Sequence, residues 1–310
     1  MRAEARKRPV AAGQAPTIGE LLDRQGLLAY VLLLPGLLIL ILFIGYPFVT
    51  SLWLAVTDQS VSTSVAHFIG LDNFTDELRS QIFLQTVRNT FVYTGVTVVF
   101  KLVLGIGLAV LMNQSFRLKN LARAALLLPW IVPTALSAIA WLWLFDATFS
   151  VFNWAIVHSG LADRGINWLG EGSWAMTSII IANIWRGTPF FAITILAGLQ
   201  TVERELLDAA AVDGASSWQR FWRITLPLVR PVLLIVLLFS TIWTISDFQL
   251  VYVLTRGGPA NSTHLFGTLA YDVAVRAGQL SEGAAISLYM FPVLILCVVA
   301  LLLYFRRSST

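Results

Sequence analysis

Residues 206–231 read LLDAAAVDGASSWQRFWRITLPLVRP and lie between two strongly apolar runs of the chain. Three consecutive alanines, a glycine and three arginines in so short a stretch do not suit a membrane span. Residues 203–212 are expected to form a short amphipathic helix, whose alanines would let another protein surface approach closely. An ordinary re-entry loop is the alternative, although such a loop has no need of three alanines followed by a glycine at the turn.

The second half of this stretch predicts a reversal and another short helix. Gly214 permits a sharp turn because glycine readily takes positive φ. Ser216 or Ser217 is expected to cap a helix over residues 218–224. Pro227 is expected to end that helix, and Arg230 would mark the start of the next span. The whole stretch therefore predicts a helix–turn–helix on one face of a membrane.

The composition indicates that lipid is the main solvent of this chain. Of its 310 residues, 57% are hydrophobic and only 12% are charged, whereas a soluble domain carries about 25% charged residues. So few charges cannot cover a globular surface. The single cysteine, Cys297, lies in an apolar run and cannot form an internal disulfide.

The apolar runs predict an all-α membrane protein with six spans. A span needs about 20 mainly apolar residues, and prolines inside a membrane helix are tolerated when neighbours satisfy the freed backbone groups. The first apolar run is too long for a signal-peptide core of roughly 7–15 residues, so it is interpreted as a retained span. Residues 1–26 and 306–310 are expected to be tails, and residues 27–305 the membrane domain. The six predicted spans are 27–49, 90–112, 124–144, 175–199, 232–254 and 284–305.

The distribution of Lys and Arg predicts the orientation in the membrane. With the N-terminus inside, the inner segments hold 14 Lys and Arg and the outer loops hold four, or five if Arg88 at a boundary is included. Cytoplasmic loops carry the excess of these residues. Both termini and residues 206–231 are therefore expected to be cytoplasmic. The positive charge thus marks topology, which argues against nucleic acid as a partner.

Motifs for catalysis, metal binding and nucleotide binding are absent from the sequence. None of the three lysines follows a glycine, so the GK[ST] end of a phosphate-binding loop is missing. The three histidines lie far apart in predicted outer loops, and no HExxH, GxSxG or CxxC occurs. We therefore expect no catalytic residues, no metal site and no cofactor bound by this chain.

Three ionisable residues fall within or beside the predicted spans. Lys101 is expected to snorkel or to pair within the helix bundle, and a role in the functional site is the alternative. Arg186 lies in NIWRGTPF, where glycine and proline predict a broken helix that lines a cavity. A charge at the centre of a span costs about 2.5–3.5 kcal/mol on insertion scales, so something should offset it. Asp247, towards the outer end of the fifth predicted span, is one candidate partner.

The stretch at 206–231 resembles the EAA motif of permease subunits in bacterial ATP-binding-cassette (ABC) importers. Asp208, Ala209 and Ala210 are followed after three residues by Gly214 and, after nine more, by the ITLP sequence that holds Ile224, Leu226 and Pro227. The motif usually begins with Glu, and Asp208 keeps the charge with a shorter reach. The stretches NIWRGTPFFAITILAGLQ, DFQLVYVLTRGGPANST and FIGLDNF also resemble carbohydrate importers, in particular the larger permease of maltose and glycerol-phosphate systems.

The resemblance implies a type I ABC importer permease fold in a bacterial plasma membrane. Residues about 203–226 would be a cytoplasmic coupling helix that sits in a cleft of a cytosolic ATPase. ATP and Mg²⁺ would bind to that partner, so this chain would be a transport subunit and not an enzyme. The implied partners are a second permease subunit, two ATPase copies, an extracytoplasmic sugar-binding protein or lipoprotein, and membrane lipid.

The resemblance to the maltose permease also implies a sugar path. Aromatic faces stack on the apolar faces of a pyranose, and hydroxyl and amide groups bond its hydroxyls. Ser240 and Thr244, four residues apart, would alternatively only hold helices together. Arg186 departs from the more apolar pattern of the family and would favour an anionic or more polyhydroxylated substrate, or pair with Asp247. The implied path residues are Trp130, Thr134, Asn183, Arg186, Gly187, Phe190, Ser240, Thr244 and Asp247.

The sequence thus predicts a subunit of an ATP-driven importer for a mono- or disaccharide such as trehalose or maltose. A polyol, glycerol phosphate or an amino acid is the alternative substrate. A stand-alone secondary carrier is the alternative from another class, although the chain has one doubtful intramembrane acid and no inverted repeat. A membrane-embedded enzyme has no catalytic cluster to support it.

Overall fold

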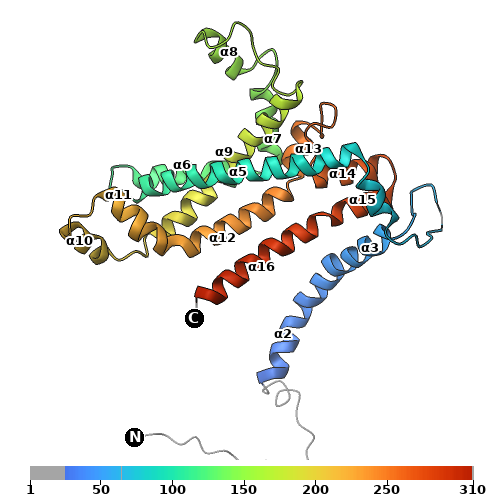
Figure 1. Ribbon diagram of the computed structural model, residues 1–310, viewed down its shortest axis with the longest axis horizontal. Helices are drawn as coiled ribbons and strands as arrows, with labels where there is room; N and C mark the ends of the chain where they lie inside the picture. The colour runs from blue at the N-terminus through green and yellow to red at the C-terminus, as the bar shows by residue number, and fades with distance from the viewer. Residues whose placement is uncertain (1–24, 64, 309–310) are drawn as a thin grey trace, which may run out of the picture. The chain divides into compact units, whose positions relative to one another are not determined.

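The computed structural model describes residues 25–63 and 65–308, and Figure 1 shows their course. These residues form α-helices and short π-helical turns, and outside the helices one isolated bridge joins Thr57 to Phe68. The prediction of an all-helical chain is confirmed. The chain divides into two compact units, with the boundary after Trp53.

Within the described residues, five helices are long and apolar enough to span a membrane, and a sixth span is possible if one bent pair counts as a single span. The spanning segments are Leu28–Ala55, Gln81–Asn113 (α5), Gly172–Leu199 (α9), Ser217–Ile245 and Leu280–Tyr304. The first comprises α2 (Gln25–Leu40), the π-turn η1 (Ile41–Gly45) and α3 (Tyr46–Ala55). The fourth comprises α11 (Ser217–Arg220), the π-turn η2 (Phe221–Thr225) and α12 (Leu226–Ile245). The last begins with α15 (Leu280–Leu288) and continues into α16 (Met290–Ser308).

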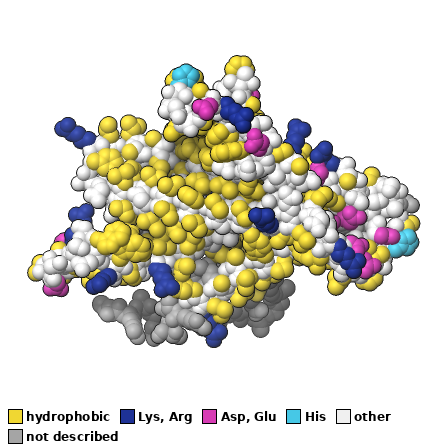
Figure 2. Space-filling view, turned by 45° about the horizontal axis from the view of Figure 1, so that its top comes forward, with side chains coloured by type: hydrophobic (Ala, Val, Ile, Leu, Met, Phe, Trp, Pro, Cys, Tyr) yellow, Lys and Arg dark blue, Asp and Glu magenta, His cyan; other side chains and the backbone are white. Residues whose placement is uncertain are grey.

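Shorter helices lie between the spans. On Figure 1, α10 (Arg204–Val212) and α11 lie at one end of the long helices of the second unit, and α13 to α15 lie at the other end. Figure 2 shows hydrophobic side chains over most of the visible face, with charged side chains mainly near its edges. That distribution suits a protein whose middle faces lipid. The remaining short elements are α4 (Asp72–Glu77), α8 (Val151–His158), α13 (Gln249–Leu254), α14 (Phe266–Tyr271) and the π-turn η3 (Asp272–Arg276).

The third predicted span, 124–144, is a bent pair of helices. α6 (Lys119–Ile131) and α7 (Thr134–Leu144) meet at an angle of 93°. Val132 has ψ of 129°, because a following proline drives the preceding residue out of the helical region. Pro133 is therefore the cause of the bend, which the sequence alone did not predict.

Pro227 does not end a helix, so that expectation is wrong. The Leu226 N–H donates to the Phe221 carbonyl, five residues back, and the helix passes through η2 into α12. A proline has no N–H to donate, and the wider π-turn just before it changes the hydrogen-bond register locally. The same arrangement precedes Pro47, where the Tyr46 N–H donates to Ile41 across η1.

The expected break near Arg186 is also absent. α9 runs unbroken from Gly172 to Leu199, with Pro189 inside it. One residue before that proline, the Thr188 hydroxyl donates to the Ile184 carbonyl at 2.7 Å. The carbonyl that Pro189 leaves free is that of Trp185, four residues back, so the Thr188 bond is an ordinary side-chain bond to the preceding turn.

Glycines allow the long helices to approach closely. A Cβ on Gly105 of α5 would collide with Phe191 of α9, and a Cβ on Gly198 of α9 would lie 2.9 Å from Val229 of α12. Small residues at helix–helix contacts are typical of membrane bundles. The tight packing of α5, α9 and α12 fixes the relative positions of the side chains they carry.

Candidate functional site

A cavity of about 420 Å³ lies between the helices of the second unit, and all nine implied path residues line it. Trp130 lies in the last turn of α6 and Thr134 begins α7, so both flank the bend at Pro133 and both line the cavity. α9 contributes Asn183, Arg186, Gly187 and Phe190; α12 contributes Ser240 and Thr244; and Asp247 lies in the turn between α12 and α13.

One wall of the cavity is aromatic. The Trp130 and Phe190 rings are stacked with centroids 5.2 Å apart. Trp243 packs against both, at 5.5 Å from Trp130 and 5.0 Å from Phe190. Offset and edge-to-face contacts of this kind are favourable for aromatic rings. Three helices thus combine to give the cavity a fixed apolar surface.

The polar part of the site is a buried network of hydrogen bonds. The Tyr93 hydroxyl and the Asn183 amide each donate to Asp247 Oδ2 at 2.7 Å. The same Asn183 amide also donates to the Tyr93 hydroxyl at 2.7 Å. The Leu250 N–H donates to Asp247 Oδ1 at 3.3 Å, at the start of α13. Asp247 is therefore bound by neutral donors, while Asn183 Oδ1 is buried without a hydrogen-bond partner.

Two cations complete the lining. Lys101 of α5 is 3% exposed, and its ammonium donates to the Thr244 hydroxyl at 3.1 Å. A Cβ on Gly187 would lie 2.5 Å from Lys101 Cε, so the glycine makes room for the lysine. The Arg186 guanidinium carbon lies 5.7 Å from the Trp130 ring centroid, a cation–π contact.

Arg186 and Asp247 do not form an ion pair in the part of the chain that the structure describes. The ion pairs there join His67 to Asp58, Arg79 to Asp76, and Arg276 to Asp272. The Arg186 Nε is buried and has no hydrogen-bond partner.

Five further residues line the cavity without having been assigned to it from the sequence. For Lys101, its charge within a predicted span was a signal in the sequence, but the lysine was interpreted as snorkelling or pairing within the helix bundle. Trp243 adjoins Thr244 and gives no separate signal. The five are Lys101, Trp243, Ser246, Phe248 and Gln249.

The predicted helix–turn–helix is present at the other end of these helices. α10 ends in a Schellman motif: the Gly214 N–H donates to Ala211 and the Ala215 N–H donates to Ala210. Gly214 has φ of 82°, as expected. Ser216 caps α11 in a capping box with Gln219, in which each side chain accepts from the other residue's N–H.

Arg220 joins the two short helices. Its guanidinium donates to the Leu207 carbonyl of α10 at 3.3 Å and to Ser217 at 3.1 Å. Large apolar side chains around this turn are exposed, with Val212 at 88% and Trp218 at 71%. We call residues 204–220 the inner hairpin, after the cytoplasmic side that the sequence predicts for it. It presents an ordered apolar surface that no described residue covers.

The seven predicted coupling residues divide between this hairpin and the helix that follows it. Asp208, Ala209 and Ala210 lie on α10, and Gly214 lies at the turn. Asp208 and Ala209 are exposed, and Ala210 is half-buried. Ile224 lies in η2, and Leu226 and Pro227 begin α12. The motif therefore connects the hairpin directly to a helix that lines the cavity.

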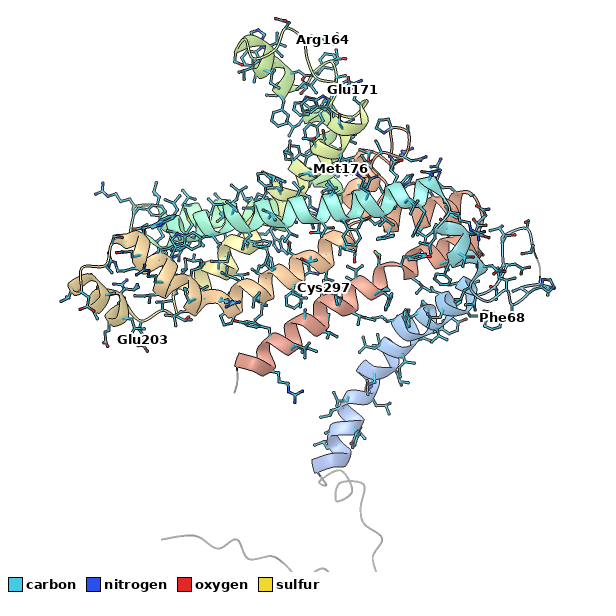
Figure 3. The ribbon with its side chains drawn as sticks, in the orientation of Figure 1. Phe68, Arg164, Glu171, Met176, Glu203 and Cys297 are labelled. Carbon is cyan, nitrogen blue, oxygen red and sulfur yellow. The ribbon has the colours of Figure 1, made fainter. Side chains whose placement is uncertain are left out.

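Metal-binding geometry is not found in the described residues, where no group of three or more His, Cys, Asp or Glu side chains is placed to hold an ion. The described acidic residues are mostly dispersed over the segments between the long helices and over residues 203–213. Figure 3 shows Arg164 and Glu171 in the segment between α8 and α9, and Glu203 at the start of α10.

Comparison with known proteins places the chain among transport proteins. Residues 101–307 match the family described as "Binding-protein-dependent transport system inner membrane component". The chain is 34% identical over 268 residues to the trehalose/maltose transport system permease protein of Thermococcus litoralis, covering 86% of this chain and 90% of that protein. It is 36% identical over 284 residues to the sulfoquinovosyl glycerol transport system permease protein of Agrobacterium fabrum, covering 91% of each.

Solved structures support the fold. A bacterial ABC transporter involved in the import of the acidic polysaccharide alginate has a chain that superposes with a TM-score of 0.79 at 21% identity, covering 94% of this chain and 99% of that chain. A second structure of a bacterial alginate ABC transporter gives a TM-score of 0.80 at 22% identity, covering 94% of this chain and 98% of that chain. The chain therefore belongs to the family of inner-membrane components of binding-protein-dependent transport systems, and it is a multi-pass permease subunit of an ABC importer and not an enzyme.

Proposed function

We propose that this chain is the membrane subunit of an ATP-driven importer for a mono- or disaccharide such as trehalose or maltose, and that its cavity is half of the sugar path. Relatives named for trehalose and maltose transport support a sugar substrate. The observation that carries the proposal is the cavity itself, in which all nine implied path residues meet.

The lining suits a sugar ring. The rings of Trp130, Phe190 and Trp243 form an apolar wall against which one face of a pyranose would pack. The hydroxyls of Thr134 and Ser240 offer donors and acceptors for its hydroxyls. Apolar walls with a few convergent polar groups are the usual composition of a ligand site, and a volume of 420 Å³ falls within the usual range of about 300–1,000 Å³.

The inner hairpin is proposed as the contact for a cytosolic ATPase. Its two capped helices form a rigid projection, and its exposed Val212 and Trp218 suit an apolar cleft. Movement of the hairpin would pass through η2 into α12 and so reach Ser240 and Thr244. ATP and Mg²⁺ would bind to the ATPase, and both chain termini would be cytoplasmic.

The complete importer is proposed to contain a second permease, two ATPase copies and an extracytoplasmic sugar-binding protein or lipoprotein. Six spans are few for an enclosed sugar path, so the cavity needs a facing surface. A similar second permease would supply it. Purification of a sugar-transporting complex with no second permease type would contradict the heterodimer.

Uptake of labelled solutes into proteoliposomes that hold the chain and its partner subunits tests the function. Sugar uptake is expected only with ATP and the binding protein. Uptake of a polyol, glycerol phosphate or an amino acid, with no sugar uptake, would replace the proposed substrate. Uptake by this chain alone on a proton gradient, without ATP, would instead identify a secondary carrier.

A further inference from the structure

The charges that line the cavity do not balance. Lys101 and Arg186 are cationic, and Asp247 is the one acidic residue among the lining side chains. Asp247 accepts hydrogen bonds from Tyr93 and Asn183, both of which are neutral. Its Oδ1 accepts from the Leu250 N–H. The described donors to the carboxylate are all neutral, and the lining side chains carry two positive charges against one negative charge.

Neither cation forms an ion pair with a described residue. The Lys101 ammonium donates to the neutral Thr244 hydroxyl, which accounts for one of its three N–H donors. Arg186 donates no hydrogen bond to a described residue, and its Nε is buried and unpartnered. Buried charges are normally paired. Lys101 is buried and Arg186 is half-buried, and one carboxylate lies in the same lining, so the imbalance points to an anion in this cavity.

The surroundings hold both cations in place. Lys101 is 3% exposed and fits where Gly187 has no side chain. Arg186 lies over the Trp130 ring, on the aromatic wall that the proposed function assigns to the sugar ring. The guanidinium is planar, always charged and suited to paired hydrogen bonds with a carboxylate, sulfonate or phosphate. Cations set beside a stacking surface can bind a ring and an acidic substituent at the same time.

We infer that the transported sugar carries an anionic substituent, such as a carboxylate or sulfonate, which Arg186 and Lys101 bind while its ring packs on Trp130 and Phe190. This inference rests on the proposed sugar importer and restricts its substrate to acidic sugars, which would replace trehalose and maltose, both neutral, as the examples. Asp247, held by Tyr93 and Asn183, would accept hydrogen bonds from sugar hydroxyls. A neutral sugar would leave the positive charge uncompensated, so the cavity would favour the acidic member of any matched pair.

The test uses the complete complex in proteoliposomes with its binding protein and ATP, and sugars in matched neutral and acidic pairs such as glucose with glucuronate. The acidic member is expected to be transported in preference to its neutral counterpart. Arg186→Gln should lower acidic-sugar uptake by about tenfold or more, the loss that follows from one charge-assisted hydrogen-bond pair. Lys101→Met should lower it as well, and Arg186→Lys should retain part of it.

Arg164→Gln is the matched control, because Arg164 is exposed in the segment between α8 and α9, outside the cavity lining (Figure 3). It should leave uptake of both sugars unchanged. The yield of assembled complex is measured for each variant. An equal yield for Arg186→Gln and wild type, with lowered acidic-sugar uptake, supports the inference.

Three results would overturn it. If neutral sugars are transported and Arg186→Gln leaves the preference unchanged, the anionic class is wrong while the sugar importer stands. If Arg186→Gln lowers the complex yield and adding Asp247→Asn restores it, the arginine balances charge within the protein. If a solute of another class is transported and no sugar is, both the proposed function and this inference fail.

Discussion

The inner hairpin and the cavity are built in contrasting ways. The hairpin is held by contacts between residues close in sequence, such as the capping box of Ser216 and Gln219 and the Schellman motif around Gly214. The cavity joins residues far apart in sequence: Lys101 bonds to Thr244 across 143 positions, and Tyr93 bonds to Asp247 across 154. The hairpin should therefore tolerate changes elsewhere in the bundle, whereas the cavity depends on the packing of several helices at once.

Gly214→Asp should have the largest effect. We expect transport to be lost while the spans remain inserted, because a charge at the turn would be buried without a partner in the ATPase cleft. Such a charge costs about 3–5 kcal/mol, enough to lower transport by more than about a hundredfold. Stimulation of the ATPase by loaded binding protein is the measurement.

Gly214→Asn is the matched control for that change. Asparagine tolerates positive φ better than most residues, and it adds no charge. It should retain a large part of the ATPase stimulation. Normal stimulation in Gly214→Asp would show that the turn does not contact the ATPase.

Tyr93→Phe should have the next largest effect. Tyr93 is fully buried and bonds to both Asn183 and Asp247. Removing its hydroxyl leaves buried polar groups short of a partner, at a cost of about 1–3 kcal/mol. We expect a lower melting temperature of the complex and weaker transport. Tyr30→Phe, at an exposed tyrosine of α2, should change neither the melting temperature nor transport. An equal loss in both variants would mean that the hydrogen bonds of Tyr93 do not stabilise the complex.

Gly187→Ala should act through Lys101. The added Cβ would lie 2.5 Å from Lys101 Cε, so the flexible lysine must shift, at a cost of about 1 kcal/mol. Transport should fall several-fold with little change in complex yield. Gly95→Ala on α5 is the control, because no atom lies within 4 Å of a Cβ there. Unaltered transport in Gly187→Ala would mean that the position of Lys101 is unimportant.

Ser216→Ala should have the smallest effect. It removes one half of the capping box at an exposed helix start and should cost about 0.5–1 kcal/mol, confined to the hairpin. Faster amide hydrogen exchange in residues 216–220, with no change in α9, would be the signature. Faster amide exchange around the cavity as well would contradict the expectation that the hairpin and the cavity are stabilised independently.

The same contrast explains what the sequence could predict. Gly214 and the serine cap follow from local chemistry within a few residues, and the structure selects Ser216 of the two candidates. Pro227 was misjudged because a π-turn before a proline leaves no clear sequence signal. The bend at Pro133 was missed because proline in a membrane helix is compatible with either outcome.

The cavity could not have been derived from local chemistry. Its nine residues were named through a resemblance to known permeases, and their meeting in one place depends on the packing of α5, α6, α9 and α12. Lys101 is the clearest example of a side chain whose position the sequence could not predict. Its partners Thr244 and Gly187 lie on two other helices, so neither spacing nor periodicity along α5 could indicate where its ammonium lies.

The central claim is that the hairpin couples to an ATPase while the cavity holds the sugar. The most direct test measures ATPase rate and sugar uptake together in proteoliposomes of the complete complex, with Gly214→Asp and Trp130→Ala compared with wild type. Gly214→Asp should lose both the stimulated ATPase rate and uptake, whereas Trp130→Ala should lose uptake and keep its basal ATPase rate. Loss of ATPase in Trp130→Ala with normal stimulation in Gly214→Asp would contradict the account.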